Sequence, residues 1–340
     1  MASTMKDIAK RTGLGLATIS KYLNGGRVRP ANQRAIDEAI HELHFSVNEA
    51  ARSLKTSRSR TIGIVIPELS NLFVTSIISV AEDILRRNGY AVIVCDCGTD
   101  PALETEAVHF LVQKGVEGIV NMPVCQDGSH LQPALDKDLT IVLIDRMIAS
   151  LKGRADGVMV DNISASFDAT EYLLRQGHQQ IGIIVGPREI FTSQQRLLGY
   201  RQAILGQGIV AMDQLISYSD YTLQGGYESL KALLKANPQM SAVFVTNYEM
   251  TLGAIMALNE LGVKIPGELS FIGFDNMQLS QVVRPRLTII TQPLSEIGEA
   301  VAKRLLAHLE NKTGGEKPSV ITLKTELLAG ESVARRLVTV

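Results

Sequence analysis

The chain has 340 residues, of which 45% are apolar, so it is long enough to bury a large core and to form two or three domains. The net charge of −1 is unevenly distributed, because residues 1–60 carry eleven Lys and Arg against five Asp and Glu whereas the remainder has a balance of −7. No apolar run is long enough for a membrane span and charged residues interrupt any signal-peptide pattern, so the sequence predicts a cytoplasmic protein.

The first predicted elements are three short helices in MKDIAKRTG (5–13), LATISKYLNGG (16–26) and RPANQRAIDEAI (29–40). Thr4 and Asp7 form a capping-box pattern before the first helix, Gly13 ends it and Gly15 opens the second. This spacing predicts a helix-turn-helix module, which reads DNA with its second helix. The Gly13-x-Gly15 pair follows a helix and lacks a third glycine, so we do not interpret it as a dinucleotide loop.

The second helix has two chemically different sides. Its buried side is expected to hold Ile19 and Leu23, and its opposite side is expected to present residues to base edges and phosphates: Leu16, Ala17, Thr18, Ser20 and Lys21. A basic surface alone is more often a solvated face than a binding site. The helical pattern favours a polyanion partner for residues 1–60.

A short basic segment separates these helices from the rest of the chain. Residues 48–55 begin with Asn48, a suitable N-cap, and continue with good helix formers and basic side chains. Eight residues are too few for a stable isolated helix, so this segment is expected to fold only when bound to something. TSRSR after it is typical of a linker.

From Thr61 onward, short β-branched runs alternate with amphipathic helices. The predicted strands end at residues 67, 96, 123, 145, 161, 186, 246 and 274, and a last β-run, ITLKTELL, covers residues 321–328. This βαβ series predicts parallel sheets covered by helices on both faces. The number of strands suggests two similar lobes that join near Asp161, with several chain crossings between them.

Cys95 and Cys97 lie two residues apart on a predicted strand, which allows either metal binding or two reduced thiols in the core. No His or Cys with ligand spacing accompanies them, and three cysteines do not suggest a disulfide framework. We therefore expect buried reduced thiols, with no metal and no cofactor.

Polar residues follow five of the predicted strands: Asp96, Asp145, Asp161, Asn247 and Asp275. Ligands of open parallel sheets bind at the carboxyl ends of the strands, and carboxylate and amide groups suit sugar hydroxyls. Any one of these residues can instead cap a loop, and Asp96 and Asp161 are the ones we expect to be structural. The series favours a polar ligand.

The segments MKDIAKRTG, LATISKYLNG and NEAARSLKTSRSRTIGIV together resemble the DNA-binding head and hinge of the lactose-repressor (LacI/GalR) family, and the similarity runs through the whole chain. The resemblance implies an all-α helix-turn-helix head on an α/β, two-lobed, periplasmic-binding-protein-like body with parallel sheets. The implied domains are a head (1–47), a hinge helix and linker (48–60), and an effector-binding and dimerisation domain (61–340). Its first lobe would comprise about 61–160 and 292–322, and its second about 161–291 and 323–340.

The resemblance also implies a homodimer on pseudo-palindromic operator DNA. Leu16, Ala17 and Lys21 would read the major groove, and Leu54 would act as a wedge in the minor groove. The full set of expected DNA contacts is Leu16, Ala17, Thr18, Lys21, Asn48, Ala51, Arg52 and Leu54. Gly15, Val47 and Asn32–Gln33 depart from the family pattern in this region.

In the body, the family's ligand-clamping arginine falls on Arg196, its inducer-contacting Asn and Asp on Asn247 and Asp275, and its stacking aromatics on Phe73 and Tyr221. Thr192 and Asp145 are further candidates. Leu72, Val74 and Tyr248 differ from the family pattern around this pocket, so we do not carry any member's effector over to this chain. A sugar, a sugar acid, a phosphosugar and a nucleoside all remain possible effectors.

These observations predict an allosteric transcription regulator, most simply a repressor, of a carbohydrate-utilisation operon. The alternative of a solute-binding protein for sugar transport fits the body but not the basic helical head. No nucleophile elbow, P-loop or zinc motif is present, so we do not expect an enzyme. No heptad repeat follows the last predicted strand, which favours a dimer over a tetramer.

Overall fold

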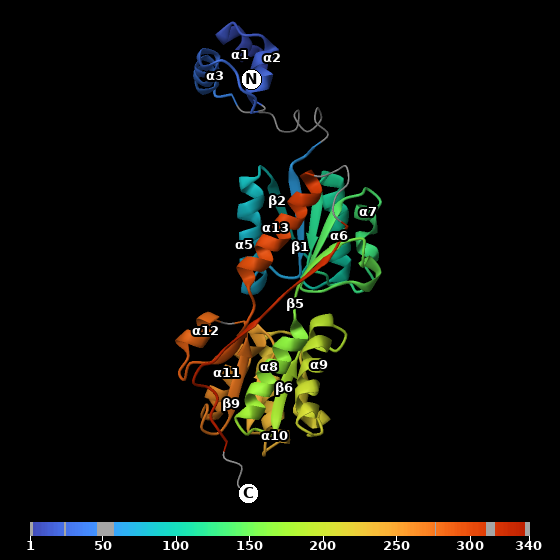
Figure 1. Cartoon of the computed structure of the whole chain (residues 1–340), viewed down its shortest axis with the longest axis vertical. Helices are drawn as coiled ribbons and strands as arrows, with labels where there is room; N and C mark the ends of the chain where they lie inside the picture. Colours follow the sequence, from blue (N-terminus) through green and yellow to red (C-terminus); the bar gives the residue numbers. More distant parts are fainter. Residues whose placement is uncertain (1–2, 24, 46–57, 276, 311–316, 337–340) are drawn as a thin grey trace. The chain divides into compact units, whose positions relative to one another are not determined.

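The structure is a computed structural model that describes residues 3–23, 25–45, 58–275, 277–310 and 317–336. The chain divides into two compact units, Met1–Arg60 and Thr61–Val340. Figure 1 shows the helices of the first unit and the two lobes of the second. None of the described helices is long and apolar enough to cross a membrane.

The first unit packs three helices around a small apolar core: α1 (Met5–Thr12), α2 (Leu16–Leu23) and α3 (Pro30–Glu42). Ile8, Ile19, Ile36 and Ala39 are its buried members. The residues that the sequence predicts at the helix ends occupy those positions in the structure. Asp7 accepts a hydrogen bond from the backbone N–H of Thr4 at 2.8 Å, Gly13 ends α1 with a φ of 70°, and Pro30 is the first residue of α3.

The first lobe of the second unit is built on a six-stranded parallel sheet in the order β11-β5-β4-β3-β1-β2. Its strands are β1 (Thr61–Ile66), β2 (Ala91–Asp96), β3 (Gly118–Asn121), β4 (Thr140–Ile144), β5 (Asp156–Val160) and β11 (Val320–Leu323). The helices are α5 (Leu72–Arg87), α6 (Pro101–Lys114), α7 (Gln132–Leu135) and α13 (Leu294–Glu310), with 3-10 turns at η1 (Ser129–Leu131) and η2 (Ala149–Leu151). Apolar side chains on both faces of the sheet form two buried clusters, as expected for a sheet covered by helices on both sides.

The second lobe repeats this plan in the order β12-β10-β9-β8-β6-β7, with β12 antiparallel to β10. The strands are β6 (Ile181–Val185), β7 (Ile216–Tyr218), β8 (Ala242–Val245), β9 (Ser270–Phe274), β10 (Thr288–Thr291) and β12 (Glu326–Leu328). The helices are α8 (Asn162–Arg175), α9 (Phe191–Gly206), α10 (Leu223–Ala236), α11 (Tyr248–Leu261) and α12 (Met277–Val282), with a 3-10 turn at η3 (Asp213–Leu215). Buried apolar clusters again lie on both faces of the sheet.

The chain passes between the lobes three times: from β5 to α8, from β10 to α13, and from β11 to β12. The last passage divides the predicted β-run ITLKTELL into two strands, close to the 322/323 lobe boundary that the family resemblance implies. Residues 320–323 pair with β5 in the first lobe and residues 326–328 pair with β10 in the second. Periodicity could not reveal this, because one extended segment contributes to two sheets.

The predicted fold class is confirmed, with helices in the head and two lobes with largely parallel sheets in the body. The expectation for the cysteines needs a correction. All three thiols are free, but only Cys97 is buried, and Cys95 and Cys125 are half-buried. Cys97 packs in the core of the first lobe, whereas Cys95, on the edge strand β2, packs only partly against the same cluster.

Candidate functional site

Helix α2 presents the predicted base-reading residues on its exposed side. Leu16 is 46% exposed, and Ala17 and Lys21 are also exposed. Thr18 is half-buried, and Ile19, on the other side, is fully buried. This division leaves apolar and basic groups free at the N-terminal part of the helix, as expected of a recognition helix.

A groove beside α2 brings in two cations that the sequence analysis did not single out. It is lined by Ala17, Thr18 and Lys21 together with Arg27, Val28, Arg29 and Asn32. Both arginines are exposed. The charge balance of residues 1–60 included them, but nothing in the helical periodicity placed the turn 27–29 next to α2. Asn48, Ala51, Arg52 and Leu54 lie outside the described residues.

The seven residues expected to bind an effector line one cleft of about 520 Å³ between the two lobes. They are Phe73, Asp145, Thr192, Arg196, Tyr221, Asn247 and Asp275. The cleft lies at the carboxyl ends of both sheets, where ligands of open parallel sheets bind. The structure therefore brings together residues that are 202 positions apart in the sequence, from Phe73 to Asp275.

Backbone strain is concentrated at this cleft. Seven described residues other than glycine have a positive φ, and four of them line it: Thr99 (61°), Asp145, Tyr221 and Asp275 (67° each). Residues that carry a Cβ atom rarely adopt a positive φ because of steric clashes. Non-glycine residues held in this conformation therefore tend to mark binding sites. At Asp145 and Asp275 the backbone turns directly after β4 and β9, and this turn brings the carboxylates to the end of each sheet.

Arg196 is the most buried cation of the cleft, at 4% exposure. Its Nε donates to Asn162 Oδ1 at 2.8 Å and one terminal nitrogen donates to the carbonyl of Thr246. The guanidinium carbon lies 4.0 Å from the centroid of the Phe274 ring. These contacts fix a planar donor group at the cleft wall and leave further N–H groups for a ligand.

Asp275 is half-buried and provides a carboxylate at the cleft wall. Its Oδ2 accepts a hydrogen bond from Gln292 Nε2 at 2.7 Å, and burial raises the pKa of this carboxyl from 3.8 to about 7 although Arg196 acts in the opposite direction. Asp275 Oδ1 and Gln292 Oε1 are buried and have no hydrogen-bond partner among the described residues. Two unpaired acceptors at the cleft wall are costly unless a ligand donates to them.

Tyr221 is held by the first turn of α9. Its hydroxyl bonds to Thr192 Oγ1 at 3.0 Å and to Ser193 Oγ at 2.5 Å. The ring lies against Gly186 at the end of β6, where an added Cβ would come within 2.1 Å of the ring. Gly186 is thus required for the position of Tyr221, and the sequence analysis did not identify it because only the neighbouring ring gives the glycine a role.

The remaining candidates also have structural roles. Asn247 caps α11 through Met250 N at 2.8 Å, and its amide nitrogen remains available as a donor. Phe73 N donates at 3.0 Å to Oδ1 of Asn71, which caps α5. Asp161 caps α8 through Ser164 N and does not line the cleft, whereas Asp96 accepts from Leu69 N and Gly98 N and does line it.

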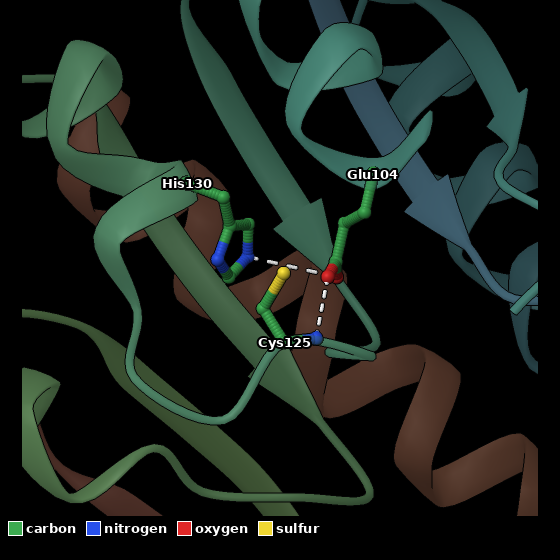
Figure 2. A group of neighbouring side chains, drawn as sticks. All are labelled: Glu104, Cys125 and His130. Carbon is green, nitrogen blue, oxygen red and sulfur yellow. Dashed lines mark hydrogen bonds and ion pairs between the residues drawn. The ribbon is translucent and has the colours of Figure 1, made fainter. Parts of the chain in front are cut away.

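A second cluster of chemically capable side chains lies in the first lobe, where Glu104, Cys125 and His130 place their ligand atoms within 4.8 Å of one another (Figure 2). Glu104 already accepts hydrogen bonds from Val124 N, Cys125 N and Asn121 Nδ2 at 2.6–2.9 Å. Burial, a hydrogen bond with Glu104 and the Glu104 charge raise the pKa of the Cys125 thiol to about 12, so without a metal ion Cys125 is a neutral thiol.

The neighbouring histidine lies beside the same carboxylate. His130 Nε2 lies 3.0 Å from Asn121 Oδ1 and 3.5 Å from Glu104 Oε1, and both are acceptors, so Nε2 carries the proton, whereas the buried Nδ1 has no hydrogen-bond partner among the described residues. We interpret Glu104 as the group that holds the loop 121–125. Periodicity did not reveal this role, because the carboxylate sits on an otherwise ordinary helix, α6.

Comparison with known proteins gives a consistent result. Residues 59–330 match the family model described as periplasmic binding proteins and sugar binding domain of LacI family. Catabolite control protein A of Priestia megaterium is 32% identical over 92% of this chain and 94% of its own length. The HTH-type transcriptional repressor CytR of Escherichia coli (strain K12) is also 32% identical, over 92% of each chain.

Solved structures agree at the level of the fold. A complex of the transcriptional regulator CelR with cellobiose is 26% identical, covers 97% of this chain and 99% of that chain, and has a TM-score of 0.74. The lac repressor dimer bound to operator and the anti-inducer ONPF covers 98% of this chain and 100% of that chain with a TM-score of 0.83. Its identity of 22% supports the fold alone.

Proposed function

This chain belongs to the LacI family of transcription regulators, and we propose that it is a cytoplasmic repressor of a carbohydrate-utilisation operon whose affinity for operator DNA depends on a small polyhydroxyl effector. The head would bind the operator through α2, and the cleft between the lobes would bind the effector. Coupling free energies of this kind are typically about 1–3 kcal/mol.

One observation supports the effector site above all others. The residues chosen from separate strand ends and loops line a single cleft, and two buried acceptors there, Asp275 Oδ1 and Gln292 Oε1, have no partner among the described residues. A molecule with several hydroxyl groups supplies donors for these oxygens and acceptors for Arg196. The relatives are named regulators and the chain carries the helical head, so a transport protein and an enzyme are not the functions we propose.

We also propose that the protein acts as a homodimer. Strand β2 is an edge of the first sheet, and Val94 on it is 36% exposed. Leu69 and Leu72, in the loop and helix start nearby, are each 49% exposed, and Leu69 N donates to Asp96 at the end of β2. Apolar groups at a sheet edge are typical of an association surface. Light scattering of the purified chain tests this proposal, because a homodimer has twice the mass of the 37.0 kDa chain.

The decisive experiment uses the full chain. Its operator is selected from a random DNA pool, and the dissociation constant is then measured by fluorescence anisotropy with and without sugars, sugar acids, sugar phosphates and nucleosides. The proposal expects one class of compound to change operator affinity at least 5-fold. Selection that returns no enriched sequence would contradict the DNA-binding role, and unchanged affinity with every compound would contradict the effector role.

A further inference from the structure

The cleft between the lobes has a pronounced excess of negative charge. Six of its lining residues are acidic and two are basic. The acids are Glu68, Asp96, Asp145, Asp220, Glu249 and Asp275, and the bases are Arg146 and Arg196. With Asp275 neutral, the acids still outnumber the bases by five to two. Because the protein that surrounds the cleft has a low dielectric constant, this excess of negative charge interacts strongly with any charged ligand.

Both cations are already engaged by neighbouring acceptors. Arg146 lies 3.3 Å from the carboxylate of Asp145 and donates to the carbonyl of Pro123 at 3.0 Å. Arg196 donates to Asn162 and Thr246 and lies over the ring of Phe274, close enough to Asp275 to lower the pKa of its carboxyl. Arg146 is therefore paired with a carboxylate, and the remaining N–H groups of Arg196 lie in a cleft where acidic residues outnumber basic ones.

The buried polar atoms of the cleft that have no hydrogen-bond partner among the described residues are acceptors. Asp275 Oδ1 and Gln292 Oε1 are buried and need hydrogen-bond donors. A phosphate or carboxylate group has no donor to give when ionised, and it would add negative charge to a cleft in which acidic residues already outnumber basic ones. A hydroxyl or an ammonium group can donate to either oxygen.

The two lobes also contribute one glutamate each whose charges interact: Glu68, after β1, and Glu249, at the start of α11. Burial and the charge of Glu68 both raise the pKa of Glu249, so the two carboxylates repel each other across the cleft. A ligand that adds negative charge increases this repulsion, whereas a neutral or cationic ligand does not.

We propose that the effector is an uncharged or amine-bearing polyhydroxyl compound and that this cleft discriminates against phosphorylated and carboxylated analogues. The inference rests on the proposed function, since it assumes that the cleft binds the effector. It narrows the four classes that the sequence left open, because sugar acids and phosphosugars are excluded whereas neutral sugars, amino sugars and nucleosides are retained.

The first test compares matched ligands by isothermal titration calorimetry with the full chain. The sets are glucose, glucosamine, gluconate and glucose 6-phosphate; ribose and ribose 5-phosphate; and adenosine and its 5′-monophosphate. For any scaffold that binds, we expect the phosphate or acid to bind at least 10-fold more weakly than the neutral or amino member. An anionic member that binds as tightly as its neutral counterpart, or more tightly, would overturn the proposal.

The second test needs no ligand. In the Leu223→Cys variant the new thiol lies in the cleft, and in the Leu205→Cys variant it lies on the outer side of α9, where Leu205 is 62% exposed. Reaction rates with a cationic and an anionic methanethiosulfonate are followed at each position by peptide mass. We expect the cation-to-anion ratio to be several-fold higher at position 223 than at 205.

The double substitution Glu68→Gln/Glu249→Gln should lower the ratio at 223, and the exposed substitution Glu228→Gln should leave it unchanged. An equal ratio at 223 and 205 would overturn the charge assignment. A high ratio together with an operator affinity that no neutral, amino or anionic compound changes would instead contradict the proposed function, so the two failures are distinguishable.

Discussion

Asp145 and Asp275 are counterparts in the two lobes. Each follows the third strand from one edge of its sheet, β4 or β9, and each has a φ of 67°. Asp145 N donates to Val158 O on β5 at 3.1 Å, and Asp275 N donates to Ile290 O on β10 at 2.7 Å. The same strained turn thus delivers one carboxylate from each lobe to the shared cleft.

The two carboxylates nevertheless differ in environment. Asp145 has Arg146 beside it, whereas the pKa of Asp275 is raised by burial and raised further by the negative charge of Asp145. Two equivalent positions in a repeated fold therefore have different tasks. Asp145 is compensated within its own lobe, and Asp275 retains an unpaired oxygen for a donor.

The first prediction concerns stability and pH. The pKa of Asp275 is raised from 3.8 to about 7 in the folded chain, so between these values the unfolded chain binds fewer protons and stability falls as pH rises. The cost is absent below about pH 4 and complete above about pH 7. We expect Asp275→Asn to raise the free energy of unfolding by a few kcal/mol at pH 8 and to change it little at pH 4, at about 1.4 kcal/mol per pKa unit.

Urea unfolding at the two pH values measures this difference. Asp213→Asn is the matched control, because the side chain of Asp213 is 92% exposed. If Asp275→Asn kept the pH dependence of the parent chain's stability, the Asp275 carboxyl would not be the cause of that dependence. The same variant should bind effector poorly, which would make the cleft an example of stability sacrificed for function.

The fold class and a set of residues that meet in one cleft could be predicted from the sequence, because both follow from the order of strands and helices along the chain. Strand ends in parallel sheets converge, so Asp145, Asn247 and Asp275 could be grouped without coordinates. Gln292 and Asn162 were not identified, although each also follows a strand, because their roles depend on contacts with Asp275 and Arg196. Such contacts come from packing and are not visible in local patterns.

The second prediction concerns Gly186. An alanine Cβ there would meet the Tyr221 ring at 2.1 Å, so Gly186→Ala must displace the ring and break its bonds to Thr192 and Ser193. We expect effector affinity to fall at least 10-fold in calorimetry while operator affinity without effector stays within 2-fold. Gly206→Ala, at the end of α9 with nothing within 4 Å, should bind like the parent chain. If Gly186→Ala bound the effector with unchanged affinity, Tyr221 would not contribute to effector binding.

The third prediction concerns Arg196. Arg196→Ala removes the buried guanidinium and leaves Asn162 Oδ1 and Thr246 O without that donor, so a decrease of about 1–3 kcal/mol in stability is expected. The effector response of operator binding should disappear, while operator affinity itself remains, because the head is a separate unit. Arg201→Ala, on the exposed side of the same helix, is the control. A normal effector titration by Arg196→Ala would refute its assignment.

The fourth prediction concerns Glu104. The Glu104→Gln side chain would place an amide N–H group among three donors that now share a carboxylate, so we expect the free energy of unfolding to fall by about 2 kcal/mol. Glu106→Gln, exposed on the same helix, should have no effect. We expect zinc and a chelator to leave the melting temperature of the parent chain unchanged. A stabilisation of several degrees by zinc would make the cluster in Figure 2 a metal site.

The last prediction concerns the groove beside α2. Asn32 and Gln33 stand where the family pattern has a phosphate-contacting pair, and the exposed Arg27 and Arg29 lie in the same part of the head. We expect these arginines to bind DNA phosphates. Each phosphate that a cation neutralises adds about 0.9 to the slope of log affinity against log salt, so Arg29→Ala should reduce the slope by roughly one and weaken all DNA sequences alike. Leu16→Ala should keep the slope and reduce the preference for the operator, since an apolar residue reads bases and releases no counterion. Lys235→Ala, in the body, is the control for both. A slope that Arg29→Ala leaves unchanged would mean that the arginine does not touch the DNA backbone.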